Sequence, residues 1–319
     1  MSGDARSAGD GVKRAWATEV GERRVAAKSD ALLSTEFLAQ LERLSLVSRR
    51  PVRGWAAGDR TSRRPGRSVE FCDYRAYGVG DDLRYVDWNI FARTDRLYLK
   101  LFVDDEDLCL HLLVDASASM DWGAPSKLQW AARLAAALGF VGLASLERVG
   151  VGILRERLAE GWAPGRGRGR ITSLFEFLGG LEGGGTTNLN AGLASYAARA
   201  QGSGLVVLVS DLLDPGGYEA GLKSLLERRL EVHVIHVLSP DELEPELAGD
   251  LRLVDRETGE ARPLSIDAAT LAAYRERLQR FLDGAEAFCR NHAIQYQRAA
   301  SDVPVEKLVL QALRGRLLA

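Results

Sequence analysis

The sequence predicts an α/β protein in which a doubly wound, mainly parallel sheet follows a smaller, β-rich N-terminal subdomain. Apolar strand-like segments alternate with helical segments from residue 108 onward, which is typical of parallel sheets covered by helices on both faces. Residues 205–209 form an unbroken apolar run, as expected of a strand buried on both faces. Residues 68–107 instead mix aromatic and charged residues and end in an alternating, strand-like stretch at 97–103.

The N-terminal third divides into three segments. Residues 1–34 combine Gly, Ser, Ala and charges without sustained periodicity, which predicts a flexible tail. Apolar residues at 35–46 recur at helical spacing, with Ser34 as the expected cap. Residues 49–67 hold seven arginines and one acid among Pro and Gly, which predicts a loop with a charge of +6. We group residues 35–107 as one unit made of this helix, the basic loop and the β-rich subdomain.

Residues 108–319 are expected to form one doubly wound domain. Apolar residues at steps of three and four predict a long amphipathic helix at 271–288. Residues 251–264 predict a hairpin that turns at Thr258 and Gly259, inserted near 250–265 before the sheet resumes. The expected strands are 109–115, 149–155, 205–211, 232–238 and 293–299, with a short antiparallel return at 158–162; the other expected helices are 127–146, 171–181, one from near 190, 218–229 and 305–318.

Composition excludes several classes of protein. A hydrophobic content of 46% with 27% charged residues indicates a globular chain, and a net charge of -2 provides no overall attraction to nucleic acid or membranes. The three cysteines are far apart and form no C-x-x-C pair, which argues against a disulfide framework or a cysteine zinc site and suits a reducing compartment. The longest uncharged run has 13 residues, short of the ~20 that span a bilayer. Because the N-terminus also lacks an apolar leader, we expect a cytoplasmic protein.

Oxygen-bearing side chains gather where three segments should reach one edge of the sheet. Asp115, Ser117 and Ser119 alternate just after the first strand of this domain, and Asp211 ends the strand at 205–211. A glycine-rich loop before a helix adds a threonine; spacing favours Thr187, and Thr186 is the alternative. Ligands of open α/β sheets bind outside the carboxyl ends of the strands, where these residues should meet.

The chemistry of this set points to a hard divalent cation. Two carboxylates and three hydroxyls, without sulfur or imidazole, suit Mg²⁺ or Mn²⁺. Such an ion with an open coordination position would accept a carboxylate from another molecule, so the predicted site binds a partner. Each residue alone is also a common turn or cap residue. Their order at the correct strand ends favours the metal site.

The motifs D-A-S-A-S-M, G-T-T-N-L and V-S-D together resemble the metal-ion-dependent adhesion site of von Willebrand factor A domains. That resemblance implies a Rossmann-like fold and a metal-binding set of five residues. The implied ligands are Asp115, Ser117, Ser119, Thr187 and Asp211.

Residues 66–102 are similar to the signature of the bacterial domain-of-unknown-function fifty-eight family, and the likeness extends over about residues 35–319. Members place this segment ahead of a von Willebrand factor A-like domain, and their genes often lie beside MoxR-type AAA+ ATPases. The resemblance therefore implies such an ATPase as a partner. Many relatives read Gly-Thr-Asp-Leu where this chain has Asn188 after Thr187, and some carry transmembrane helices that we do not expect here.

The signature contains a dense cluster of charged residues around a tryptophan. We interpret it as ion pairs and a packed ring that hold the subdomain to the sheet, because arginine suits interface ion pairs. A partner-recognition face is the alternative, and we assign no catalytic role. The cluster comprises Asp81, Asp82, Arg84, Asp87, Trp88 and Arg93.

The sequence favours a non-enzymatic adaptor over two rivals. A Mg²⁺-dependent hydrolase or phosphatase is the first, but Ser117 stands where a phosphoryl-transfer site with a nucleophilic Asp115 would need a second aspartate, and no G-x-S-x-G or P-loop motif occurs. His233 and His236 should face opposite sides of one strand and cannot share an ion. Nucleic-acid binding through the basic loop at 49–67 is the second rival, which lacks a recognised binding module.

Overall fold

The computed structural model describes residues 32–46, 70–78, 81, 83–103, 108–159, 161–200, 204–314 and 317–318. Most of the predicted N-terminal tail and the whole basic loop at 49–67 lie outside these residues. The chain divides into two compact units, one formed by residues 1–48 with 108–319 and the other by residues 49–107. The helix α2 (Thr35–Leu41) belongs to the larger unit, whereas the sequence analysis grouped it with the smaller one. Its place is fixed by Phe37 and Leu41, which are buried in the larger unit's core.

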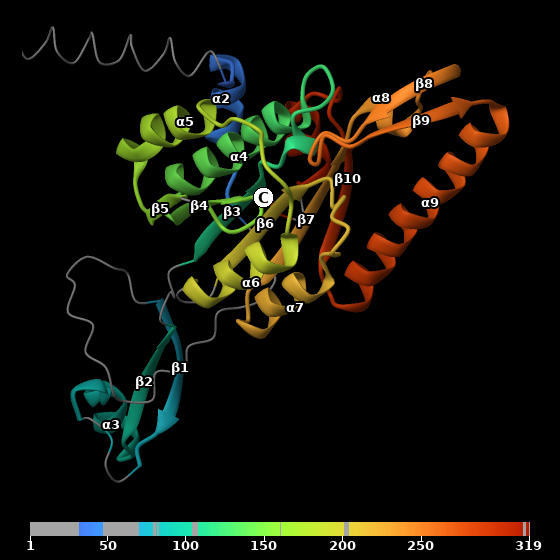
Figure 1. Ribbon diagram of the computed structural model, residues 1–319. Helices are drawn as coiled ribbons and strands as arrows, with labels where there is room; N and C mark the ends of the chain where they lie inside the picture. The colour runs from blue at the N-terminus through green and yellow to red at the C-terminus, as the bar shows by residue number, and fades with distance from the viewer. Residues whose placement is uncertain are drawn as a thin grey trace, which may run out of the picture. The chain divides into compact units, whose positions relative to one another are not determined.

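The larger unit is built on a six-stranded sheet with the order β10-β7-β6-β3-β4-β5 (Figure 1). Neighbouring strands pair in parallel except β4 and β5, which pair antiparallel. The predicted doubly wound, mainly parallel α/β sheet is therefore confirmed. The strands are β3 (Cys109–Asp115), β4 (Arg148–Leu154), β5 (Trp162–Gly165), β6 (Gly204–Ser210), β7 (Glu231–Leu238) and β10 (Gln295–Ala300).

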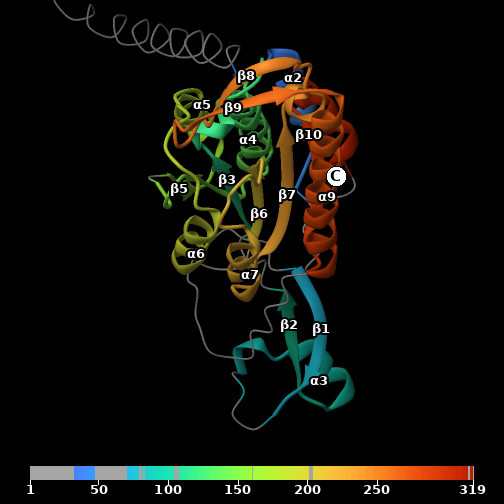
Figure 2. The same cartoon turned by 45° about the vertical axis from the view of Figure 1, so that its right-hand side comes forward.

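Helices cover both faces of this sheet, which explains why β3, β6 and β7 are buried along their whole length (Figures 1 and 2). Alternate side chains of each strand enter two separate apolar cores; Leu112 packs on one side of β3 and Leu113 on the other. One core contains α2, α4 (Lys127–Ala144) and α5 (Ile171–Gly179); the other contains α6 (Leu189–Arg199), α7 (Glu219–Glu227) and α9 (Ala268–Asn291).

The C-terminal segment differs from the single helix predicted at 305–318. It forms a short helix, α10 (Val305–Lys307), and a wide π-helical turn at Leu308–Ala312. Leu313, Leu317 and Leu318 are also buried, and Leu318 forms an isolated bridge with Leu46. The predicted helix at 305–318 is therefore not continuous.

The predicted hairpin near 250–265 is confirmed. After β7, a short helix α8 (Pro240–Leu243) leads into the strands β8 (Gly249–Val254) and β9 (Ala261–Ile266), which pair antiparallel. These two strands form their own sheet and share no ladder with the central one. The hairpin and α8 are drawn in orange in Figures 1 and 2.

The smaller unit contains an antiparallel pair, β1 (Glu70–Ala76) and β2 (Tyr98–Val103), with a 3-10 turn at Leu83–Tyr85 and a helix α3 (Trp88–Thr94) between them. The sequence analysis expected strands here but not α3, whose start is capped by Asp87 accepting hydrogen bonds from the Asn89 and Ile90 amides.

The charged signature cluster lies in the smaller unit, and its predicted role in holding that unit to the sheet stays a prediction. Asp81 pairs with Arg75 at 2.8 Å, which lowers the pKa of Asp81. Within this unit, 57% of Trp88 is exposed, and its ring contacts Phe91 of the same helix. Arg93 donates to the Asn89 carbonyl, and Asp82 lies outside the described residues. Among the residues described, no helix combines the length and the apolar character needed to cross a membrane.

Candidate metal centre

The fold brings the carboxyl ends of β3 and β6 side by side at the switch point of the sheet. The chain leaves β3 for β4 on one side, while β6 pairs with β3 on the other. Crevices that bind ligands lie at such points in open α/β sheets. Asp115 is the last residue of β3, Ser210 is the last of β6, and Asp211 follows directly. The switch point therefore supplies two carboxylates and a hydroxyl from adjacent strands.

Asp115 is a wholly buried carboxylate. Its Oδ1 accepts hydrogen bonds from the Ser117 amide at 3.0 Å and the Ser117 hydroxyl at 2.7 Å, and its Oδ2 accepts one from the Ser210 hydroxyl at 2.7 Å. None of the salt bridges among the described residues involves Asp115. Burial, followed by the neighbouring charge of Asp211, raises the pKa of Asp115 to about 7. Asp115 itself therefore has no ion-pair partner among the described residues, although Lys127 pairs with the neighbouring Asp211.

Ser117 and Ser119 place their hydroxyl oxygens 3.0 Å apart beside Asp115. Adjacent ligands of an octahedral Mg²⁺ at ~2.0 to 2.1 Å lie about 2.8 to 3.0 Å from each other, so this spacing suits a shared ion. The described residues contain no group of three or more His, Cys, Asp or Glu side chains that could hold a metal. The set at this edge uses mainly hydroxyls, and its oxygen chemistry fits a hard divalent cation.

Asp211 already has a cationic partner. Its Oδ2 accepts a hydrogen bond from the Lys127 ammonium at 2.7 Å, and both side chains are 1% exposed or less. Lys127 also pairs with Glu242 of α8. The sequence analysis missed Lys127 and Glu242. One signal was available, since Lys127 opens α4 directly after the cap Ser126, where the helix dipole disfavours a positive charge.

Thr187 lies in the loop between α5 and α6, which runs beside the loop after β3. Two backbone hydrogen bonds join the loops, from Gly184 to the Ala116 carbonyl and from Ala118 to the Gly185 carbonyl. Thr187 does not bond to Asp115, Ser117 or Ser119. Its hydroxyl donates to Oε1 of Glu257 at 2.7 Å and its amide donates to Oε2 at 2.9 Å. Of the two candidate threonines, Thr186 is exposed and Thr187 is half-buried and engaged.

The structure thus separates the predicted set into three parts. Asp115, Ser117 and Ser119 share hydrogen bonds, Asp211 sits next to them in an ion pair, and Thr187 is tied to the β8–β9 hairpin. Glu257 and Ser210 complete the surroundings. The sequence analysis named neither as part of the site, although Ser210 stands in the quoted V-S-D motif.

The histidines of the sheet serve as buried structural groups. Nδ1 of His111 lies 2.7 Å from the Tyr196 hydroxyl, and Nδ1 of His236 lies 2.7 Å from the Tyr296 hydroxyl. Burial lowers the pKa of both histidines to about 4, which keeps them neutral. His233 contacts Glu231 instead, so the two histidines of β7 face different partners, as predicted.

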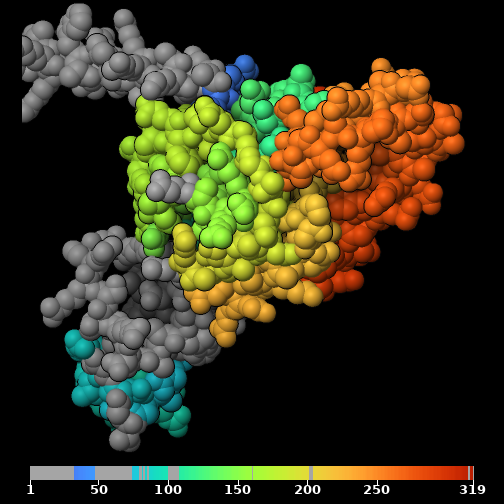
Figure 3. Space-filling model, in the orientation of Figure 1, coloured from blue at the N-terminus to red at the C-terminus, as the bar shows by residue number. Residues whose placement is uncertain are grey.

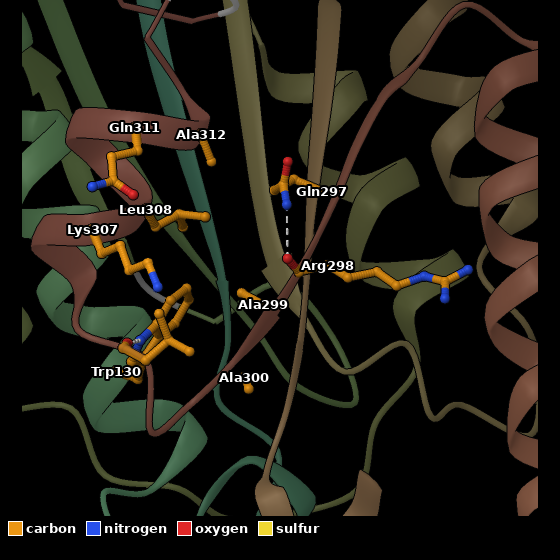
Figure 4. Close-up of a pocket in the computed structure, with 10 residues that line it drawn as sticks. Trp130, Gln297, Arg298, Ala299, Ala300, Lys307, Leu308, Gln311 and Ala312 are labelled. Carbon is orange, nitrogen blue, oxygen red and sulfur yellow. Dashed lines mark hydrogen bonds between the residues drawn. The ribbon is translucent and has the colours of Figure 1, made fainter.

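A separate cavity lies between β10, α4 and the C-terminal segment (Figure 4). The Trp130 indole donates to the Val303 carbonyl at 2.7 Å, and the Gln297 amide donates to the Arg298 carbonyl at 2.9 Å. The cavity is separate from Asp115, Ser117, Ser119 and Asp211, which we call the oxygen cluster, because none of these four residues lines it.

Comparisons with known proteins identify the family. The uncharacterized protein Rv1480 of Mycobacterium tuberculosis is 30% identical over 269 residues, which are 79% of this chain and 83% of that protein. The conserved hypothetical protein BatB of Bacteroides thetaiotaomicron is 15% identical with a TM-score of 0.41, over 65% of this chain and 98% of BatB. The SpRpn10 VWA domain is 13% identical with a TM-score of 0.37, over 64% of this chain and 94% of that domain. The model of the family described as "Protein of unknown function DUF58" matches residues 73–281, which is more than half of the sequence, and the chain therefore belongs to this family.

Proposed function

We propose that the chain is an adaptor that binds a carboxylate of a partner protein through a Mg²⁺ or Mn²⁺ ion. Asp115, Ser117 and Ser119 would hold the ion, with Thr187 and Asp211 beside them. The observation that carries the proposal is the Asp115 carboxylate, which is wholly buried, raised in pKa and unpaired with any cation among the described residues. Burying an ionised carboxylate costs several kcal/mol unless a positive charge compensates it, and a bound cation would provide that charge.

The donor set also explains why the ion would recruit an acidic partner. One carboxylate and neutral hydroxyls leave a divalent ion with excess positive charge, and Mg²⁺ keeps exchangeable positions in such sites. The bound ion would supply electrostatic attraction for an incoming carboxylate. The chain's own residues would fix the position of that contact at the switch point of the sheet.

The proposal contains no catalytic step. Within the described structure, the hydroxyls of Ser117, Ser119 and Ser210 bond to Asp115, to each other and to the Leu212 amide, and none bonds to a histidine or lysine base. A serine nucleophile needs such a base. The arrangement therefore favours binding over hydrolysis by a serine nucleophile.

We extend the proposal to a MoxR-type AAA+ ATPase as the partner, which the family resemblance supports. We place this interaction in the cytoplasm, where the buried free thiols Cys109 and Cys289 stay reduced.

Ser119→Ala is expected to weaken partner binding about tenfold or more, because it removes one hydroxyl ligand while leaving the Asp115 hydrogen bonds in place. The immobilised chain would be titrated with the MoxR-type ATPase of the same organism by surface plasmon resonance, without nucleotide, in Mg²⁺ and in EDTA. Binding should require Mg²⁺. Ser224→Ala is the matched control, because its half-buried hydroxyl lies on α7 and, within the described part of the chain, bonds to the Gly221 carbonyl alone. Equal binding by wild type and Ser119→Ala would contradict the proposal.

A further inference from the structure

The tip of the β8–β9 hairpin docks onto the two loops that border the oxygen cluster. Figure 3 shows the orange surface of the hairpin meeting the green surface of the loop after β3. The contacts come from two consecutive residues of the turn, Arg256 and Glu257, which reach the loops at 117–122 and 182–187. The hairpin tip, defined here as residues 255–258, therefore covers the edge at which a partner would bind.

Glu257 makes the more specific of these contacts. Its two carboxylate oxygens accept hydrogen bonds from the hydroxyl and the amide of Thr187, 70 residues away in the sequence. Hydrogen bonds to an ionised acceptor are about twice as strong as neutral ones, and two of them fix the carboxylate's orientation. Glu257 is half-buried, whereas the residues on either side of it, at 252–256 and 258–260, are exposed. This pattern shows that the turn points one acidic side chain into the molecule.

Arg256 forms the second attachment. Its guanidinium donates to the Asp121 carbonyl at 2.5 Å, lies 3.7 Å from the Asp121 carboxylate and stands 5.5 Å from the ring centre of Trp122. Trp122 is 43% exposed, so part of its ring remains available beside the docked arginine. The bordering loops thus accept an acidic and a basic side chain in adjacent positions.

The base of the hairpin is linked to the same centre. Glu242 of α8 pairs with Lys127, which pairs with Asp211, and the Glu242 carbonyl accepts a hydrogen bond from the Tyr274 hydroxyl at 2.6 Å. The two strands form no ladder with the central sheet. The tip can therefore leave its loops without breaking backbone hydrogen bonds of the sheet.

We propose that the hairpin tip is an intramolecular ligand of this site, with Glu257 in the position that a partner's carboxylate takes. The proposal rests on the proposed function and adds two statements to it. A partner binds by displacing the tip, and the segment it presents carries an acidic residue next to a basic one, as Arg256 and Glu257 do. In the resting protein the hairpin tip therefore occupies the partner-binding site. Because Glu257 is tethered to the chain, a partner's carboxylate must compete with it at an effective concentration in the millimolar range.

The test uses the full chain and the linear pentapeptide acetyl-Asp-Arg-Glu-Thr-Gly-amide, which carries the sequence of residues 255–259. Glu257→Ala is expected to bind the labelled pentapeptide at least about tenfold more tightly than the wild type does in fluorescence anisotropy. A pentapeptide with Gln in place of Glu should not bind. Glu260→Ala is the matched control from the same turn, since Glu260 pairs only with Arg262 at the surface, and it should behave as the wild type.

Hydrogen exchange on the same proteins gives the second readout. Peptides covering residues 182–189 and 249–266 should exchange faster in Glu257→Ala than in Glu260→Ala. Equal pentapeptide affinity for wild type and Glu257→Ala, binding to neither, or unchanged exchange would overturn the inference. If Mg²⁺ still binds in that case, the proposed metal site stands without the hairpin ligand. If Glu257→Ala gains affinity equally in Mg²⁺ and in EDTA, the inference holds and the metal-dependent function fails.

Discussion

Lys127→Met is expected to destabilise the folded protein by about 3 to 5 kcal/mol, because it leaves Asp211 as a buried charge without a partner. Lys127 is completely buried, and Asp211 is 1% exposed. Glu242 is 19% exposed and can recover solvation, so most of the loss falls on Asp211. Urea denaturation of the two proteins in EDTA, followed by circular dichroism, measures the difference in the free energy of unfolding.

Two further variants separate this cause from a general packing defect. Asp211→Asn combined with Lys127→Met should recover much of the lost stability, because the pair is then removed together. Arg280→Met tests the same loss of a cation at the surface, where the partner is Glu276 and both side chains are more than 70% exposed. It should cost no more than about 0.5 kcal/mol. A Lys127→Met cost as small as the Arg280→Met cost would show that the buried pair is unimportant.

Asp115→Asn should raise the stability of the metal-free protein by roughly 2 to 4 kcal/mol at pH 8. At pH 8 the wild-type Asp115 carboxylate is ionised, and its burial destabilises the folded state. Asparagine has nearly the same shape but carries no charge. Because the folded-state pKa of Asp115 is raised to about 7, the folded protein binds a proton more tightly than the unfolded one. The wild type therefore gains stability as the pH falls from 8 towards 4, and the advantage of Asp115→Asn should shrink over the same range.

Thermal or urea unfolding in EDTA across this pH range checks the expectation. Asp283→Asn is the matched control, because Asp283 is 61% exposed and pairs with Arg298 at the surface. Its effect should stay below about 1 kcal/mol at every pH. If Asp115→Asn is less stable than the wild type in EDTA at pH 8, the carboxylate is not the strained charge that the structure implies.

Sequence patterns predicted the sheet because burial and periodicity are local properties of each strand. The apolar run at 205–209 became the buried strand β6, and the alternation of strands and helices gave the doubly wound order. The same logic placed Asp115, Ser117 and Ser119 together, since they follow one strand. Asp211 was placed beside them because parallel strands end at the same edge.

The remaining features depend on contacts between distant segments, which local patterns do not encode. Lysine side chains are almost never fully buried, so the sequence analysis did not consider Lys127 as part of the site. Its position at the start of a helix was the one available signal. The contact between Glu257 and Thr187 joins an inserted hairpin to a loop 70 residues earlier. The sequence analysis did not predict helix α3, because its aromatic residues suggested a strand, although Asp87 is a typical N-cap residue.

Isothermal titration calorimetry with Mn²⁺ tests the central claim most directly, because it measures the ion itself rather than its consequences. The wild type should bind one ion per chain at the oxygen cluster. Ser119→Ala should bind it at least about tenfold more weakly, and Asp115→Asn should show no binding at this site, since it loses the only unpaired carboxylate of the cluster. Binding of Mn²⁺ to Asp115→Asn with wild-type affinity and stoichiometry, or no binding to the wild type, would contradict the account.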